Sequence, residues 1–497
     1  MSDQHRTETT TETTDHRWLA LIVLCVGMLM IVLDVTVVNV ALPSIQDDLG
    51  FSQSSLAWVV NAYLISFGGL LLLAGRLGDL VGRRRVFMIG LAVFTVASLL
   101  CGFAQSQGLL VVSRFVQGVG GAMTSAVILG MIVTMFPEPR EQAKAIGIYG
   151  FVASAGGSIG LLAGGILTEG INYHWIFFIN LPIAIGTALL AARLIEADEG
   201  IGIGRGADVL GAVLVTSALM LGVYTIVKAS EYGWGSLHTL GLGAASLALL
   251  GAFILRQARA VNPLMPLRVF RSRNVSGANL IQVVTVAGLF GMFFLGTLYL
   301  QRVLGFDPLE IGFAFLPATI VMGICSAGLS ARVNMRFGAR VTVIPALGFL
   351  VVGLVLFARG PVDGSYLSDV LPPVILIGIG AGLAFPSLMT LAMSGATQAD
   401  AGLASGLINT TAQVGGALGL AVLATLSASR SEDLLAEGRS PASALTSGYH
   451  LAFVIGAALV VVGIVLAVTV LRPESEAARE IAEREPGGLD PVYSEGR

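Results

Sequence analysis

The feature that most constrains the fold is a series of apolar blocks, each about 18 to 25 residues long and separated from the next by a short polar loop. As an α-helix, a block of this length crosses the hydrocarbon core of a bilayer. A membrane-spanning β-strand needs only about ten residues, so the block length excludes a barrel. Hydrophobic residues make up 55% of the chain and charged residues 12%, a balance that soluble domains do not have. The sequence therefore predicts an all-α integral membrane protein.

The 497 residues accommodate about fourteen such spans. A first group of six covers residues 18–194, a pair covers 207–255, and a last group of six covers 274–471. The segments 1–17 and 472–497 are predicted to be tails outside the bilayer, because the apolar run that follows the first tail is too long for a signal peptide. We therefore expect two six-helix bundles separated by two additional middle spans.

Arginine and lysine indicate the orientation, because cytoplasmic loops of membrane proteins carry an excess of positive charge. When alternate loops are assigned to alternate sides, most of the 28 basic residues fall on one side. The opposite side receives only Lys228, Arg302, Arg359, Arg430 and Arg439. Both termini are therefore predicted to be cytoplasmic, and the protein is expected in the inner or plasma membrane.

Asp34 lies inside the apolar run from Trp18 to Leu42. An ionised carboxylate at such a place is disfavoured by about 2.5 to 3.5 kcal/mol on insertion scales, so a membrane protein seldom keeps one without a use for it. A carboxyl group in a medium of low dielectric constant, able to bind and release a proton, is a common means of coupling transport to a proton gradient. We interpret Asp34 as a proton carrier.

Arg114 lies inside the fourth predicted span, where a buried cation needs a carboxylate or carbonyl partner. Arg114, Gln117, Gly118 and Gly121 follow the spacing i, i+3, i+4, i+7 and therefore share one helix face. Asp34 is the only acidic residue well inside a span of the first half. We therefore expect Arg114 to tune the protonation of Asp34, and a structural arginine bonded to backbone carbonyls is the alternative.

Glycines of the fifth and thirteenth predicted spans share one register. Four pairs are separated by the same interval: Gly147 and Gly406, Gly156 and Gly415, Gly157 and Gly416, Gly160 and Gly419. Two halves related in this way suit alternating access, in which one bundle rocks against the other. Gly156, Gly160 and Gly164 clear one helix face, which can be a static packing seam or a sliding surface.

Four stretches of the sequence carry a family resemblance. They are 33–43 in the first span, with Asp34, Thr36 and Asn39; 75–85 after the second; 110–122 in the fourth; and 156–165 in the fifth. Together they resemble the fourteen-span drug:proton antiporters of the major facilitator superfamily, and the resemblance covers nearly the whole chain. It implies a major facilitator fold, and it makes Gly156, Gly160, Gly164 and Gly165 an antiport motif. Leu161 departs from the family, which usually has proline there.

The loop after the second predicted span contains Gly75, Asp79, Gly82, Arg83 and Arg84, and the resemblance implies that these residues form a gate. A carboxylate at a cytoplasmic helix end accepts hydrogen bonds from arginines or from the first amides of another helix. Such a charge-assisted lock must break when the halves rock. Gly82 is expected to permit the tight turn. A simple anchor of positive charge is the alternative interpretation of the arginines.

Amide side chains inside the spans are candidates for substrate binding, because an amide that faces lipid is costly. The candidates are Asn39, Gln117, Asn279, Gln282, Asn409 and Gln413. Other carboxylates, such as Asp208, lie at predicted span ends, where water is expected to solvate them. Without a second carboxylate deep in a span, the pocket suits monocationic, neutral or weakly polar lipophilic compounds better than dications.

These observations predict a proton-coupled exporter of small lipophilic drugs, antibiotics or dyes. Its expected partners are that substrate, protons and the lipid bilayer, with no nucleic acid and no cofactor. The sequence has no Gly-x-x-x-x-Gly-Lys-Ser/Thr loop, so we expect no use of ATP. The three cysteines have no spacing typical of a metal site, and no nucleophile or paired carboxylates indicate a catalytic centre. Uptake of a nutrient or organic anion by symport, and a non-transporting membrane sensor, remain alternatives.

Overall fold

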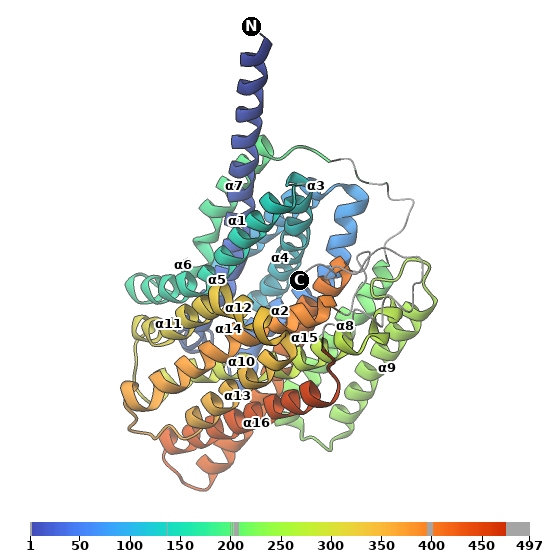
Figure 1. Cartoon of the computed structure of the whole chain (residues 1–497). Helices are drawn as coiled ribbons and strands as arrows, with labels where there is room; N and C mark the ends of the chain where they lie inside the picture. The colour runs from blue at the N-terminus through green and yellow to red at the C-terminus, as the bar shows by residue number, and fades with distance from the viewer. Residues whose placement is uncertain are drawn as a thin grey trace.

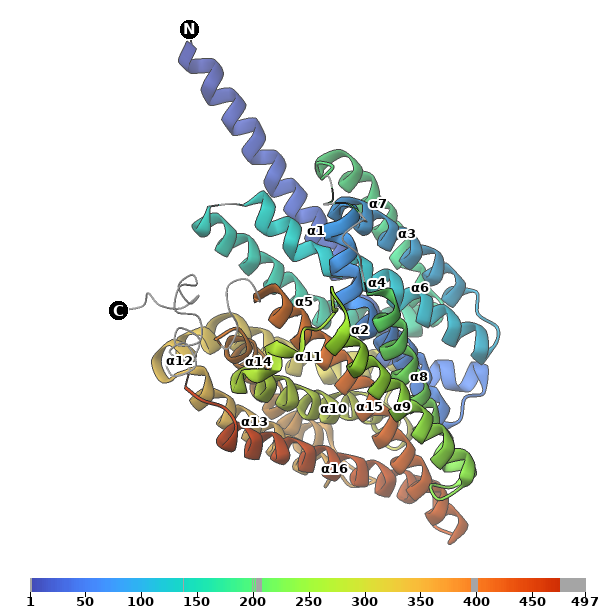
Figure 2. The same cartoon turned by 90° about the vertical axis from the view of Figure 1, so that its right-hand side faces the viewer.

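The structure, a computed structural model, describes residues 2–136, 138–198, 200, 202, 208–394 and 401–473. It is a bundle of long helices (Figures 1 and 2). Thirteen helices of the described residues are long and apolar enough to cross a membrane. α5 (Pro139–Gly170) has 32 residues and supplies the fourteenth. The predicted all-α membrane fold is therefore confirmed and the structure is consistent with about fourteen spans, whereas the predicted domain boundaries stay a prediction.

The first half consists of α1 to α7. Its helices are α1 (Ser2–Leu49), α2 (Gln53–Val81), α3 (Arg83–Gly102), α4 (Gln107–Met135), α5, α6 (Trp175–Phe178) and α7 (Asn180–Leu194). α1 begins before the predicted first span. It is helical without a break through residues 2–17, and this part projects from the bundle (Figure 1). The sixth span is built from two pieces, α6 and α7.

The second half consists of α10 to α16 and follows a short 3-10 helix, η2 (Leu267–Arg271). Its elements are α10 (Arg273–Arg302), α11 (Pro308–Ile324), η3 (Cys325–Leu329), α12 (Ser330–Phe337), α13 (Ala339–Phe357), η4 (Tyr366–Val370), α14 (Leu371–Ser394), α15 (Ala401–Ala436) and α16 (Pro441–Thr469). α11, η3 and α12 are continuous and form one span from Pro308 to Phe337.

The middle pair consists of α8 (Val209–Tyr232) and α9 (Leu237–Arg259). α8 packs against α2 of the first half and against α15 of the second half, whereas α9 packs mainly against α8 (Figure 2). The two additional helices therefore lie beside the boundary between the halves.

Polar caps mark where several helices begin. Ser52 accepts a hydrogen bond from the Ser55 amide at the start of α2, and Ser106 does the same for Leu109 at the start of α4. Each cap satisfies an amide that has no partner within its helix. Gly82 joins α2 to α3 with φ +101°, a conformation that side chains other than glycine rarely adopt, and this agrees with the predicted tight turn.

The spans alternate in direction, so their ends gather at two ends of the bundle. We call these the Asp79 end, where α2 meets α3, and the Asp47 end, where α1 meets α2. At the Asp47 end the two halves touch. Asp47 of α1 forms an ion pair with Arg302 of α10, and Gln53 of α2 donates to Ser427 of α15 over 3.4 Å. The halves are therefore in contact at this end.

The shared glycine register corresponds to equivalent helix contacts in the two halves. A Cβ atom on Gly156 would lie 3.1 Å from Val32 of α1, and one on Gly415 would lie 2.7 Å from Val283 of α10. Gly160 likewise faces Thr36 of α1, while its counterpart Gly419 lies against α10. Thus α5 packs on α1 as α15 packs on α10, through helix faces that carry no side chains.

The stripe of Gly156, Gly160 and Gly164 faces α1, a helix of the same half. In this conformation it is a packing seam within the first half. Gly165, on another face of α5, points across the boundary instead, because a Cβ atom there would lie 2.8 Å from the Cα atom of Leu309 in α11. Sequence periodicity groups residues by helix face, but it does not say which neighbour each face meets.

Candidate functional site

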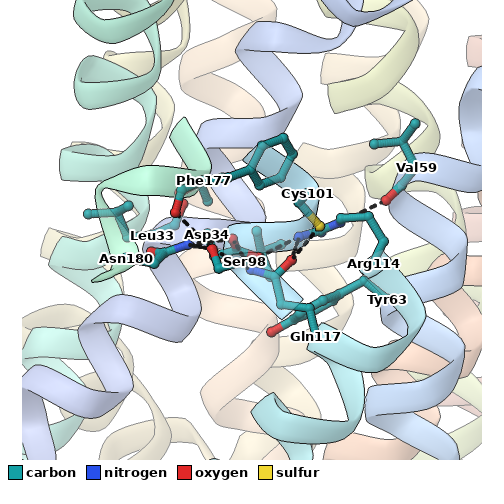
Figure 3. Close-up of polar contacts among 12 residues, drawn as sticks. Leu33, Asp34, Val59, Tyr63, Ser98, Cys101, Arg114, Gln117, Phe177 and Asn180 are labelled. Carbon is teal, nitrogen blue, oxygen red and sulfur yellow. Dashed lines mark hydrogen bonds and ion pairs between the residues drawn. The ribbon is translucent and has the colours of Figure 1, made fainter. Parts of the chain in front are cut away.

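The site is centred on the carboxylate of Asp34, which lies inside the first half and is 1% exposed. Arg114 of α4 donates from Nη1 to Asp34 Oδ2 over 2.6 Å. Gln117 of α4 and Asn180 of α7 donate from their amide nitrogens to Asp34 Oδ1 over 2.7 and 2.8 Å (Figure 3). The structure thus brings Asp34 and Arg114 into direct contact, within a network that also includes two amides.

Arg114 has further partners on the side away from Asp34. Its Nε donates to the backbone oxygen of Val59 over 3.0 Å, and Nη1 also donates to Gln117 Oε1 over 2.7 Å. The guanidinium group lies over the ring of Tyr63, 4.5 Å from the ring centroid. The sequence left open a carboxylate or a carbonyl partner for this arginine, and the structure provides both.

Ser98 of α3 completes the network at its other side. Its hydroxyl accepts hydrogen bonds from Gln117 over 3.3 Å and from Asn180 over 3.0 Å, and it donates to the backbone oxygen of Phe177 over 2.8 Å. Gln117, Asn180 and Ser98 are each fully buried. The side-chain nitrogens of Gln117 and Asn180 and the Ser98 hydroxyl thus find partners across four helices, whereas Asn180 Oδ1 has none among the described residues.

Glycines of α4 allow this convergence. A Cβ atom on Gly118 would lie 2.5 Å from the backbone oxygen of Tyr63 in α2, and one on Gly120 would lie 2.4 Å from the backbone nitrogen of Phe94 in α3. A side chain at either place would push a neighbouring helix away. Close approach of α2 and α3 to α4 is what keeps Arg114 within reach of its partners.

The network as arranged fits an ionised carboxylate, because every side-chain group that contacts Asp34 is a donor: Arg114, Gln117 and Asn180. A protonated carboxyl group carries a donor of its own and would meet other donors at both oxygens. Proton uptake therefore requires at least one of these partners to move. The charge of Asp34 and the positions of the side chains around it are linked by this geometry.

A cavity of about 680 Å³ reaches the Asp79 end between the halves. α1, α2, α3, α4, α5 and α15 contribute to its lining, and so do Asp208 and the segment 261–266 after α9. The predicted gate residues Gly75, Asp79 and Arg83 and the predicted substrate residues Asn409 and Gln413 all line it. Of the six predicted substrate residues, Asn409 and Gln413 are the two that line this cavity.

The other predicted substrate residues lie elsewhere. Gln117 belongs to the Asp34 network, and Asn39 donates to the backbone oxygen of Val35 within its own helix. Asn279 of α10 donates to the backbone oxygen of Val275 and accepts from Thr411 of α15. Gln282 is buried and does not line the cavity. In this conformation these four residues do not line this cavity, and their role in substrate binding stays a prediction.

The gate motif forms a compact cluster at the Asp79 end. Arg83 donates to Asp79 over 3.1 Å, and also to the Gly130 backbone oxygen and the Thr134 hydroxyl of α4 over 2.9 and 2.7 Å. In the part of the chain that the structure describes, these contacts all lie within the first half. Among the described residues, the contacts of Arg83 with Asp79 and α4 thus do not lock one half to the other.

Asp198 is a second carboxylate in this cluster, which the sequence did not indicate. It follows α7 and accepts hydrogen bonds from the amides of Arg83 and Arg84 over 2.7 and 3.1 Å. Its charge therefore lies at the N-terminus of α3, where the helix dipole favours an anion.

The expectation that water solvates Asp208 at a span end is wrong, because this residue is only 3% exposed. It accepts hydrogen bonds from the Gly211 amide at 2.9 Å, from Gln257 at 2.7 Å and from Arg256 at 3.0 Å. Burial acts to raise the pKa of Asp208, but these hydrogen bonds outweigh it and the pKa lies below its ordinary value. The end of α9 covers this carboxylate, which the local sequence could not reveal.

Sequence reasoning also missed Asn180, Ser98 and Tyr63 as parts of the site. Asn180 lies inside an apolar run, next to Leu181 and Pro182. Burying an amide side chain without a hydrogen-bond partner is costly, so its presence there could have indicated a site residue. Ser98 and Tyr63 gave no such signal, since hydroxyl groups are common in membrane helices. Among the described residues, no group of three or more metal-ligating side chains is placed to hold a metal ion.

Comparisons with known proteins agree with this architecture. The sequence profile described as Major Facilitator Superfamily matches residues 24–420. The puromycin resistance protein pur8 of Streptomyces alboniger is 39% identical over 470 residues, which cover 93% of each chain. The cephamycin export protein CmcT of Amycolatopsis lactamdurans is 39% identical over 477 residues, which cover 95% of this chain and 94% of that protein.

A solved structure extends the comparison to three dimensions. It is the crystal structure of a bacterial homolog to the human lysosomal transporter Spinster, in an inward-facing and unoccupied conformation. It matches with a TM-score of 0.65 at 15% sequence identity, over 94% of this chain and 98% of that chain, and this likeness shows the fold. The chain therefore belongs to the Major Facilitator Superfamily of membrane transporters.

Proposed function

We propose that the protein is a proton-coupled exporter of small lipophilic compounds, which it exchanges for protons by alternating access. The buried contact between Asp34 and Arg114 carries this proposal. A charge pair removed from water is costly unless its geometry is good, and it is a common site of proton coupling in membrane transporters. The printed names of the relatives, a puromycin resistance protein and a cephamycin export protein, support export as the direction.

The Asp79 end faces the cytoplasm in this proposal, and both termini are cytoplasmic. The run of Arg83, Arg84 and Arg85 at that end supports this orientation, because positive charge is retained on the cytoplasmic side. The cavity then reaches the cytoplasm while the halves touch at the Asp47 end. This is the conformation that would take cargo from inside the cell.

The cavity supports a cargo of small, mostly apolar compounds. Its volume of about 680 Å³ lies within the range of drug-sized binding sites, roughly 300 to 1,000 Å³. Met28, Phe67, Leu71 and Leu72 provide apolar surface, and Gln413 provides a hydrogen-bonding amide. Flexible methionine and aromatic side chains adapt to cargo of different shapes. The lining also carries Arg76, Asp79, Arg83 and Asp208, two charges of each sign, and monocationic, neutral and weakly polar compounds fit it.

Proton and cargo would alternate through the two conformations as follows. When the Asp47 end opens, Asp34 takes up a proton from outside, and its contacts with Arg114, Gln117 and Asn180 loosen. When the Asp79 end opens again, the proton leaves to the cytoplasm and the network that accepts a charged carboxylate re-forms. Asp79 and Arg83 would latch the cytoplasmic side in the outward-facing state. The gradient supplies the energy, without ATP or a cofactor.

Proteoliposomes that contain the purified chain test the proposal. An imposed pH gradient should drive ethidium transport in exchange for protons, and a proton uncoupler should abolish it. Asp34→Asn should lose this transport by at least tenfold, whereas Asp433→Asn, which removes an exposed carboxylate at the Asp47 end, should retain it. Full pH-driven transport by Asp34→Asn would refute Asp34 as the proton carrier. Movement of ethidium in the same direction as protons would instead support symport.

A further inference from the structure

The cargo cavity and the proton site are close but separate. The lining of the cavity includes Phe67, and it includes neither Asp34 nor Arg114. On α2 the lining residues run from Asp79 at the helix end to Phe67, which is the deepest of them along that helix. If cargo is to influence protonation of Asp34, something must connect the two sites.

Two aromatic side chains occupy the space between them. Phe67 stacks on Tyr63, one helical turn further along α2, with ring centroids 5.7 Å apart and an angle of 23° between planes. Tyr63 in turn lies over the guanidinium group of Arg114, at 4.5 Å (Figure 3). Phe67, Tyr63, Arg114 and Asp34 therefore form a continuous row of contacts from the cavity to the carboxylate.

Helix α4 packs against the Tyr63 and Phe67 rings of this row. A Cβ atom on Gly121 of α4 would lie 2.8 Å from the Tyr63 hydroxyl and 3.1 Å from the Phe67 ring, so α4 packs closely on both rings. Tyr63 is fully buried, and Phe67 is 5% exposed. Closely packed side chains cannot move independently. A displacement of Phe67 by cargo must therefore be passed to Tyr63.

The ring of Tyr63, and not its hydroxyl group, makes these contacts. Among the described residues the hydroxyl is buried without a hydrogen-bond partner. A cation above an aromatic face is attracted by the ring, and the attraction depends on its position over that face. Shifting the Tyr63 ring thus changes how firmly Arg114 is held beside Asp34.

We infer that Tyr63 and Phe67 are positioning residues that transmit occupancy of the cavity to the Asp34–Arg114 pair. This inference rests on the proposed function and adds to it the means of coupling. Cargo against Phe67 holds the Tyr63 ring against Arg114 and so favours the ionised pair, whereas protonation of Asp34 loosens Arg114 and disturbs the same contact from the other side. Because coupling between two binding events is reciprocal, cargo affinity must depend on protonation to the same degree as protonation depends on cargo.

Ethidium binding by the purified full chain measures this coupling directly. For the wild type we expect the Kd at pH 6 to exceed that at pH 8 by at least tenfold, because proton and cargo compete. Tyr63→Leu and Phe67→Leu should reduce this ratio to about threefold or less, since each interrupts the row. Tyr63→Phe keeps the ring and should keep the ratio. A loss in Tyr63→Phe equal to that in Tyr63→Leu would assign the effect to the hydroxyl and overturn the ring contact as the link.

Phe94→Leu is the matched control, since Phe94 is a buried aromatic residue of α3 that is not among the residues lining the cavity. It should retain the wild-type ratio, and all variants should show the elution profile of a folded protein. Wild-type ratios in both Tyr63→Leu and Phe67→Leu would overturn the inference and leave the proposed function standing. A wild type whose ethidium affinity and transport do not respond to pH would overturn both.

Discussion

Arg114 and Asp34 are 80 residues apart in the sequence, yet Arg114 Nη1 lies 2.6 Å from Asp34 Oδ2. Each residue is only 1% exposed. Removing two charges from water is costly, and the cost is offset here by the pairing and by hydrogen bonds from the surrounding amides. The pair therefore constrains both the stability of the first half and the conditions under which Asp34 can change its charge.

Replacing only one member of this pair should destabilise the protein. Arg114→Gln leaves a buried carboxylate without its cation, a change that costs about 3 to 5 kcal/mol in buried ion pairs. Thermal unfolding of the purified protein should show a clearly lowered midpoint. Arg114→Lys keeps the charge but cannot make all the contacts of the guanidinium group, so we expect a folded protein with impaired pH-driven transport.

The double variant Asp34→Asn with Arg114→Gln separates stability from function. It removes both charges together, so it should recover much of the midpoint lost in Arg114→Gln while remaining inactive in transport. A double variant no more stable than Arg114→Gln would contradict the view that the unpaired carboxylate causes the loss.

Asn180 should contribute to the same site through one charged hydrogen bond. Asn180→Ala removes the donor to Asp34 Oδ1 and to the Ser98 hydroxyl. A hydrogen bond to a charged group contributes about 1.5 to 3 kcal/mol, so the unfolding midpoint should fall and pH-driven ethidium transport should weaken. Asn172→Ala changes an exposed asparagine before α6 and should do neither. Equal effects of the two substitutions would argue against this role of Asn180.

Asp208 should stabilise the protein over a defined range of pH. Because its pKa in the folded protein lies below the ordinary carboxyl value of about 3.9, its ionised form stabilises the fold above that pH. The contribution disappears as the pH falls through the folded-state pKa. Asp208→Asn should therefore lower the unfolding midpoint, by about 1 to 3 kcal/mol in stability, equally from pH 8 to pH 5. A difference from the wild type that shrinks already between pH 7 and pH 5 would contradict this sign.

The two glycine contacts, one in each half, should differ in whether a second substitution restores the stability lost on adding a Cβ atom. A Cβ atom on Gly160 would collide with the Thr36 hydroxyl, so Gly160→Ala should cost about 1 to 3 kcal/mol and Thr36→Ala should restore part of it. The counterpart Gly419 meets both the backbone and the Cβ atom of Ala287, and because the backbone contact remains in any variant of Ala287, no substitution there should rescue Gly419→Ala. Unfolding midpoints of the single and double variants measure the difference.

Gly186 of α7 is the control for the seams, because nothing lies within 4 Å of the place a Cβ atom would take. Gly186→Ala should be neutral or slightly stabilising, since alanine favours a helix by up to about 1 kcal/mol over glycine. Comparable losses in Gly160→Ala and Gly186→Ala would show that the close approach is not what matters.

The repeat also identifies the residue of the second half that corresponds to Asp34. Val32 and Thr36 of α1 take the places that Val283 and Ala287 take in α10, so Asp34 corresponds to Thr285. Thr285 is buried, and in the described structure its hydroxyl has no hydrogen-bond partner. The two halves share helix packing, whereas a titratable group at this position occurs in the first half only.

The sequence by itself determined the membrane class and the approximate number of spans, and it indicated Asp34 as a partner of Arg114. Each depends on a local cost: apolar blocks of bilayer length must span, and a charge inside a span must find a partner among very few candidates. The turn at Gly82 followed in the same way from the conformational freedom of glycine.

Only the tertiary structure decided which helices meet. It gave Asp34 the amides of Gln117 and Asn180, turned the stripe of Gly156 and Gly160 towards α1, and covered Asp208 with the end of α9. Periodicity assigns residues to a helix face, but the neighbour of that face comes from contacts between segments far apart in the chain. The pocket, the Asp34 network and the aromatic row between them are set by those distant contacts.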